Sequence, residues 1–182
     1  MNHRIAAQTL ALSIAALALA GCATPKDHPM GMMAGRMAVA TLSPTQGNTV
    51  TGLVMFHEMD GRLMVHAQLS GLKPGGEQGF HVHETGSCAS TDGSSAGGHF
   101  NPGGQVHGPQ NAAHHAGDLP ALKADALGRV DQKFMLDGPT VAAGPNGVVG
   151  RSLIVHAQAD DYSTQPTGNS GARVACGVIA AH

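Results

Sequence analysis

The stretch from Gly79 to Asp118 constrains this chain more than any other part of its sequence, because it combines many histidines with many glycines. In it, His81 and His83 are separated by one residue, a spacing that puts both imidazoles on one face of a β-strand. The remaining candidate ligands of the stretch lie in loop-like sequence: His99, His107, His115 and Asp118. Neutral imidazole commonly binds copper and zinc, and a carboxylate can complete a tetrahedral zinc site. The pattern predicts a metal site; the alternative is a surface loop that happens to be rich in histidine.

The other histidines are ranked by their spacing. His114 is adjacent to His115 and could replace it, but His115 is preferred because it stands three residues before Asp118. His66 lies in a strand-like run and is predicted to be a packed or exposed strand residue rather than a ligand. Three further histidines have no partner at a useful spacing and are predicted to lie on the surface: His28, His57 and His182.

Residues 1–22 have the features of an export signal and are excluded from the fold prediction. Arg4 supplies a positive charge, and the apolar run that follows it is too short to span a bilayer. The segment ends in Leu-Ala-Gly-Cys, which resembles the bacterial lipobox, so Cys22 is predicted to carry lipid and to anchor the chain to a membrane. An ordinary secretory signal with a chance cysteine is the alternative. Both interpretations predict export to an oxidising compartment.

Lipidation of Cys22 would leave two cysteines, Cys88 and Cys176, which are predicted to form a disulfide. A bridge across so long a loop contributes about 4–5 kcal/mol in the chain-entropy model.

The residue after Cys22 bears on which membrane carries the anchor. Ala23, where an aspartate could stand, favours the outer membrane of a Gram-negative cell, on the periplasmic side of the envelope. A Gram-positive surface is the alternative.

The rest of the chain is predicted to be a tether followed by one β-domain. Residues 23–35 are rich in Pro, Gly and Met and indicate a flexible tether, although their thioethers could also capture copper(I). Residues 36–182 are predicted to form an antiparallel all-β sandwich or barrel, because short apolar runs alternate with turn clusters. Asp60-Gly61 is a hairpin-turn dipeptide. The predicted strands are 36–42, 49–56, 62–69, 79–84, 129–136, 150–157 and 173–180.

The charge pattern argues against a nucleic-acid partner. The formal net charge is −2, there is no basic run, and aromatic residues make up 3% of the chain. Binding of nucleic acids needs basic stripes and stacking rings. We therefore expect no nucleic-acid binding.

Five motifs resemble the secreted bacterial branch of the copper/zinc superoxide dismutases: GFHVHE, GGHFNP, HHAGDL, VHAQADD and TGNSGARVACGVI. The resemblance covers about residues 36–180, with the motifs in the family's order. It implies an eight-stranded antiparallel Greek-key β-barrel or sandwich with long metal-binding loops. It also implies copper and zinc as cofactors and superoxide as the substrate, dismutated to dioxygen and hydrogen peroxide to protect the cell envelope.

The resemblance also implies a ligand set, carried over position by position. The copper ligands would be His81, His83, His99 and His156. The zinc ligands would be His99, His107, His115 and Asp118. His99 would then bridge the two metals as an imidazolate, which two cations together can stabilise.

Further positions match residues that support the family's metals and substrate. Asp160 matches a carboxylate that joins one copper ligand to one zinc ligand, with Asp161 as the alternative. Arg173 matches the arginine that docks superoxide beside copper, and Thr167 matches the opposite rim of the channel. His99 and Arg173 are therefore the predicted catalytic residues. The predicted Cys88–Cys176 pairing matches the family's disulfide.

One departure concerns the approach of the substrate. The loop 160–171 contains neither lysine nor glutamate, although charges in this segment steer superoxide in the eukaryotic branch. Lys73 and Lys123 are candidates to replace them, and Arg173 could also act alone.

A lipid-anchored protein that stores copper and zinc without turnover is the alternative function. A homodimer is possible, since bacterial members of the family differ in their association.

Overall fold

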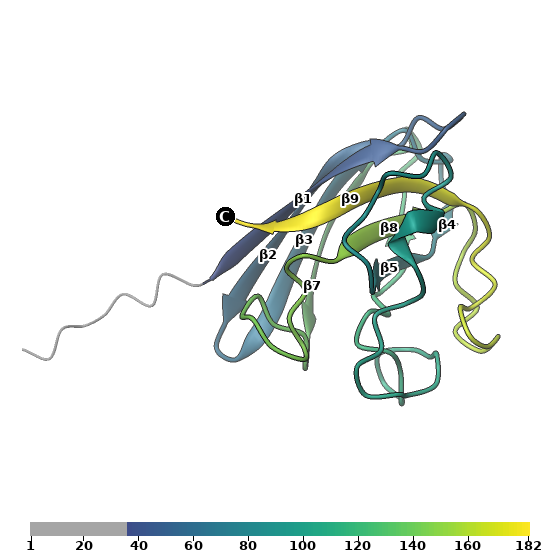
Figure 1. The fold of residues 1–182 in the computed structure, drawn as a ribbon. Coiled ribbons are helices and arrows are strands. Elements are labelled where there is room, and N and C mark those ends of the chain that lie inside the picture. The colour runs from purple at the N-terminus through teal and green to yellow at the C-terminus, as the bar shows by residue number, and fades with distance from the viewer. Residues whose placement is uncertain (1–35) are drawn as a thin grey trace, which may run out of the picture. The chain divides into compact units, whose positions relative to one another are not determined.

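The computed structural model describes residues 36–182 and shows an all-β domain (Figure 1). The strands are β1 (Met37–Pro44), β2 (Thr51–Met59), β3 (Arg62–Ser70), β4 (Glu77–Gln78), β5 (Phe80–His83), β6 (Leu122–Lys123), β7 (Val130–Leu136), β8 (Ser152–His156) and β9 (Arg173–Ala181). Seven of them form one antiparallel sheet in the order β5-β8-β9-β1-β2-β3-β7, and β4 pairs with β6 separately. The sheet is the half-barrel of a Greek-key fold, which confirms the predicted fold class.

All seven strands predicted from the sequence are present, with ends that differ by a few residues. β4 and β6 were missed because two residues are too short to show a periodic pattern. The hairpin between β2 and β3 is confirmed: Asp60 has φ 50° and Gly61 has φ 75°, the two positive values that a type I′ turn requires.

The described part of the chain contains no α-helix and only one 3-10 turn, Ser94–Ala96. Across residues 36–182, we find no helix with the length and apolar character needed to cross a membrane. The predictions for the signal segment 1–22, for Cys22 and for the tether 23–35 lie outside the described residues and stay predictions.

The core lies on the inner face of the sheet, where alternate residues of each strand are buried. In β1, β2 and β3, the paired residues Ala38, Phe56 and Val65 are fully buried. Phe80, Leu153 and Ile179 are buried on the β5-β8-β9 side of the same core. This alternation of period two leaves the intervening side chains on the outer face of the sheet.

The predicted disulfide between Cys88 and Cys176 is present. It joins the loop that follows β5 to the middle of β9. The loop also contacts Ser152 of β8, because Cys88 Sγ lies 3.8 Å from its hydroxyl. The disulfide therefore fixes the part of the histidine-rich segment between His83 and His99.

Candidate metal centre

The histidine-rich segment is held along one edge of β5. The other edge of β5 pairs with β8, so that His81 lies opposite Ile154. On the first edge, Val82 accepts a hydrogen bond from the amide of Phe100 and donates one to the carbonyl of Gly117, each 2.9 Å long. The loop residues next to these positions are therefore brought against β5: His99 opposite His83, and Asp118 opposite His81.

Gly117 allows this close approach. A Cβ atom at Gly117 would overlap the carbonyl oxygen of Val82 and lie 2.9 Å from the amide nitrogen of Phe100. Only glycine lets the two backbones come this close without a shift. Gly117 thus allows the loop to lie against a strand that carries two of the histidines.

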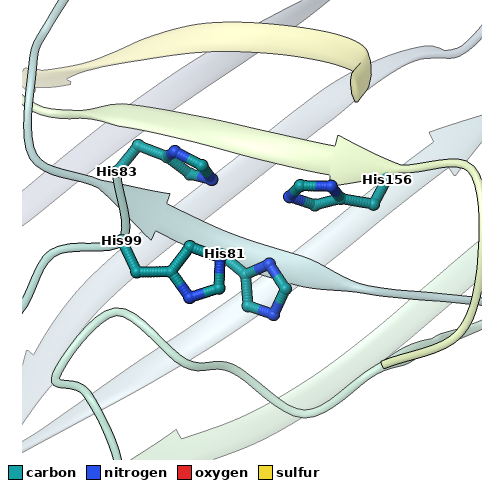
Figure 2. Close-up of side chains that lie close together, drawn as sticks. All are labelled: His81, His83, His99 and His156. Atoms are coloured by element: carbon teal, nitrogen blue, oxygen red, sulfur yellow. The ribbon is translucent and has the colours of Figure 1, made fainter. Parts of the chain in front are cut away.

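Four histidines converge on one point (Figure 2): His81, His83, His99 and His156. One ring nitrogen from each lies within 4.8 Å of the others. Within residues 36–182, those nitrogens are buried and have no hydrogen-bond partner: His81 Nδ1, His83 Nε2, His99 Nε2 and His156 Nε2. Unpaired buried nitrogens are costly, and a cluster of four is explained by a metal ion that takes all four as ligands.

The opposite nitrogen of each ring is held by the protein. His83 Nδ1 donates to the carbonyl of Gly97 at 2.9 Å, and His156 Nδ1 donates to the carbonyl of Gly171 at 3.1 Å. Because a carbonyl can only accept, these bonds fix the tautomer and leave Nε2 as a free lone pair. The backbone thus presets the rings for metal binding.

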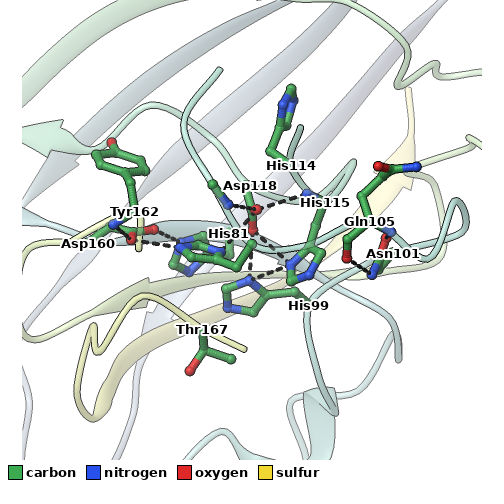
Figure 3. A network of polar contacts seen from close by, with 12 residues as sticks. His81, His99, Asn101, Gln105, His114, His115, Asp118, Asp160, Tyr162 and Thr167 are labelled. Carbon is green, nitrogen blue, oxygen red and sulfur yellow. Dashed lines mark hydrogen bonds and ion pairs between the residues drawn. The ribbon is translucent and has the colours of Figure 1, made fainter. Parts of the chain in front are cut away.

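A second cluster shares His99 with the first (Figure 3). Its members are His99, His107, His115 and Asp118, all buried, with one ligand atom each within 4.8 Å of the others. The Asp118 carboxylate lies 2.8 Å from His99 Nδ1, 3.0 Å from His107 Nδ1 and 3.2 Å from His115 Nδ1. Three imidazoles and one carboxylate form a donor set that suits tetrahedral zinc. His99 therefore presents one nitrogen to each cluster.

His114 does not join this cluster, as the spacing predicted. Figure 3 shows its ring pointing away from Asp118, and its Nδ1 donates to the carbonyl of Ala112 at 2.7 Å. His66 is also outside both clusters and bonds Asp131 through Nε2 at 2.6 Å.

Asp160 connects the two clusters. Its carboxylate accepts hydrogen bonds from His81 Nε2 at 2.6 Å and from His107 Nε2 at 2.8 Å. All three side chains are fully buried. Asp161 instead caps the exposed turn at Ser163 and Thr164. The choice of Asp160 over Asp161 thus agrees with the geometry.

Burial lowers the pKa of four of the clustered histidines. Loss of water lowers the pKa of His83 to about 2 and that of His156 to about 4, and it also lowers the pKa of His81 and His115. For Asp118, burial raises the pKa, but hydrogen bonding from His99 and the neighbouring histidines bring it down to about 2. Neutral imidazole and ionised carboxylate are the forms that bind metals.

These values predict a pH dependence for the metal-free protein. In the unfolded chain, His83 and His156 bind protons below their ordinary pKa of 6.5, whereas in the folded protein they stay neutral. The unfolded state therefore binds more protons, and the free energy of unfolding should fall by about 1–3 kcal/mol per pH unit from pH 6 to pH 4. Urea unfolding midpoints of metal-free protein test this, and a midpoint that is constant over that range would contradict it.

Arg173 lies half-buried beside the first cluster. Its Nη1 donates to the carbonyl of Gly93 at 2.7 Å and its Nη2 to the carbonyl of Gly97 at 2.6 Å. Gly97 also accepts from His83, so one carbonyl positions both the arginine and a histidine of the cluster. Thr167 is half-buried in the segment that follows Asp160 (Figure 3).

Several residues of the site carried no signal in the sequence. The carbonyls of Gly97 and Gly171 act through the backbone, which no residue type reveals. Tyr162 lies parallel to the ring of His107, with 6.5 Å between ring centroids, and Gln165 bonds the backbone of His107 at both its N–H and its C=O. These contacts depend on the loop conformation, so only the structure could show them.

A Greek-key half-barrel with two buried clusters that share one histidine defines a class of protein: one with adjacent sites suited to copper and zinc. The sequence matches the copper/zinc superoxide dismutase family over residues 50–179, and the chain belongs to this family.

Its relatives include a protein named as a copper/zinc superoxide dismutase and proteins named only as similar to superoxide dismutases. The superoxide dismutase-like protein YojM of Bacillus subtilis is 37% identical over 97% of this chain and 96% of its own length. Superoxide dismutase [Cu-Zn] 2 of Aquifex aeolicus is 37% identical over 78% of this chain and 85% of its own. A crystal structure of a SOD-like protein from Bacillus subtilis has a TM-score of 0.70 at 39% identity, covering 77% of this chain and 96% of that one.

Proposed function

We propose that this protein dismutates superoxide to dioxygen and hydrogen peroxide. The observation that carries the proposal is the shared ring of His99, which offers Nε2 to one cluster and Nδ1 to the other. The proposed copper ligands are His81, His83, His99 and His156. The proposed zinc ligands are His99, His107, His115 and Asp118. A store needs no ring shared between two different metal sites.

Copper held by the first cluster would supply one-electron redox chemistry, and zinc held by the second would supply a fixed charge with no change of oxidation state. The protein would supply the proton that the second superoxide needs. His99 Nε2 is buried and unpaired, so it can carry a proton toward the second superoxide. His99 Nδ1 faces the second cluster, 2.8 Å from Asp118, so zinc bound there would anchor the ring when Nε2 changes its protonation state.

Arg173 is proposed to dock the substrate anion. Its two hydrogen bonds to loop carbonyls fix the guanidinium, whereas its charge is not neutralised by any carboxylate within 4.0 Å among residues 36–182. A fixed positive charge beside the first cluster attracts a small anion. Lys73 lines a pocket together with His156, whereas Lys123 lines a pocket without any of the clustered residues, so Lys73 is the better candidate for steering.

The proposed setting is the cell envelope. The Cys88–Cys176 disulfide supports it, because such bridges form and persist in oxidising compartments. Lipidation of Cys22, attachment to the periplasmic side of the outer membrane and association as a homodimer are proposals that rest on the sequence and the family.

An Arg173→Gln variant distinguishes a superoxide dismutase from a protein that only stores metals. It should keep both metals at full stoichiometry, while kcat/KM for superoxide falls about tenfold or more, because the fixed positive charge is lost. Arg62→Gln is the matched control: Arg62 pairs with the exposed Asp137 at 2.6 Å, so its loss changes the net charge equally but should leave turnover unchanged. Equal turnover in the Arg173 variant and its parent would contradict the docking role. Two bound metals with no turnover in the parent would favour the store.

A further inference from the structure

The methionines of the described residues all lie on the outer face of the sheet. They are Met37, Met55, Met59, Met64 and Met135, and none of them is buried in the core. Methionine usually fills gaps in protein interiors. Here the core uses Ala, Val, Leu, Ile and Phe, and the face that an antiparallel sheet turns to water carries the thioethers.

The strand register aligns three of these methionines with a histidine. Met37 of β1 pairs with His57 of β2, His57 pairs with Met64 of β3, and Met64 pairs with Met135 of β7. We call Met37, His57, Met64 and Met135 the methionine row. Their chain neighbours Ala38, Phe56 and Leu63 are fully buried, so the side chains of the row point outward.

The spacing of the row suits a single ion above His57. Directly opposed residues on adjacent antiparallel strands have Cβ atoms about 4.5–5.5 Å apart, so Met37 and Met64 flank His57 at similar distances. A methionine side chain has three rotatable bonds and can lean toward its neighbour. All members of the row are half-buried, so their donors are partly shielded from water but accessible from it.

His57 is available as a ligand. Its ring makes no side-chain hydrogen bond to any residue from 36 to 182, in contrast to His66 in the next row, which is taken by Asp131 at 2.6 Å. Two thioethers and one imidazole form a soft donor set, which selects copper(I) over zinc, calcium and magnesium.

We propose that Met37, His57 and Met64 bind one copper(I) ion on the outer face of the sheet, with Met135 as a neighbouring thioether. This site lies on β1, β2 and β3, whereas the clustered histidines of the proposed catalytic site come from β5, from the end of β8 and from the loop after β5. It would hold copper without turnover. The argument uses none of the methionines in residues 1–35.

Silver(I), which is diamagnetic and does not change oxidation state, is the probe. It is titrated into protein whose two histidine clusters are both loaded with zinc, which is diamagnetic and needs no reductant, and in which the methionine methyl groups carry ¹³C. We expect the methyl signals of Met37 and Met64 and the ring signals of His57 to shift and to saturate together at one equivalent. Loading the histidine clusters first keeps silver away from them.

Variants assign the site. Met64→Leu conserves volume and should fold normally, yet weaken binding of silver(I) about tenfold or more. Met59→Leu is the matched control, because Met59 lies on the same face but pairs with Arg62 outside the row, and its binding should equal that of the parent.

Three outcomes would overturn the proposal. The first is a set of shifts confined to Met30, Met32 and Met33, which would place silver on the preceding segment instead. The second is equal loss of affinity in Met59→Leu and Met64→Leu, which would indicate diffuse binding. The third is an absence of shifts together with concentration-dependent association, which would show that the face instead binds a second copy of the chain. None of these readouts depends on dismutation, so failure here leaves the proposed function untouched.

Discussion

A Gly168→Ala variant should lose at least ten- to hundredfold in zinc affinity, although Gly168 binds no metal itself. A Cβ atom there would lie less than 3.0 Å from Asp160 Oδ1 and from His107 Nε2. Neither side chain can move aside, because those of Asp160 and His107 are both fully buried. The added methyl would push apart the carboxylate and imidazole that connect the two clusters, and both rings held by Asp160 would lose their fixed orientation.

Gly104→Ala is the matched control. Gly104 has φ 61° and Gly168 has φ 65°, so both alanines pay a similar backbone cost of about 1–2 kcal/mol. A Cβ atom at Gly104 would meet nothing within 4 Å. Zinc competition with a chelator should therefore show parental affinity for Gly104→Ala and a large loss for Gly168→Ala. Equal zinc affinity in the two variants would refute the role of the Asp160 connection.

Removal of the disulfide should lower the free energy of unfolding by about 4–5 kcal/mol. Cys88 and Cys176 are 88 residues apart in the sequence, so the bridge strongly restricts the unfolded chain. The double variant Cys88→Ala/Cys176→Ala would be measured by urea unfolding against the oxidised parent. A difference of less than about 1 kcal/mol would contradict the estimate and point to structure retained in the unfolded state.

The same variant should also disturb the metal centre. The loop that the disulfide fixes supplies the carbonyls of Gly93 and Gly97, which hold Arg173. Turnover should therefore fall even where both metals stay bound. Reductant provides the control: it should destabilise the parent to the level of the double variant and leave the double variant unchanged.

The sequence predicted the members of the site better than it predicted their supports. The alternate spacing of His81 and His83 indicated a strand with both rings on one side, and the three-residue step to Asp118 selected His115 over His114. Both inferences depend on local geometry, which a sequence shows directly. The motif resemblance supplied His156, which lies on a distant strand that no local spacing connects to the others.

The supports depend on contacts that only folding creates. Gly168 looks like any loop glycine until Asp160 and His107 are seen packed against it. The methionine row was equally hidden: alternation along each strand was visible, but which residue of β2 faces Met64 depends on the register. β4 and β6 were not predicted from the sequence, because they pair over only two residues.

The central claim is that this chain dismutates superoxide, and pulse radiolysis of superoxide decay tests it most directly. The sample is the protein beginning at Ala23, with its disulfide intact and its copper and zinc quantified. We predict a second-order rate constant of about 10⁸–10⁹ M⁻¹s⁻¹, in the diffusion-limited range to which superoxide dismutases belong. Stoichiometric copper and zinc with decay no faster than in buffer would contradict the account and identify the protein as a metal store.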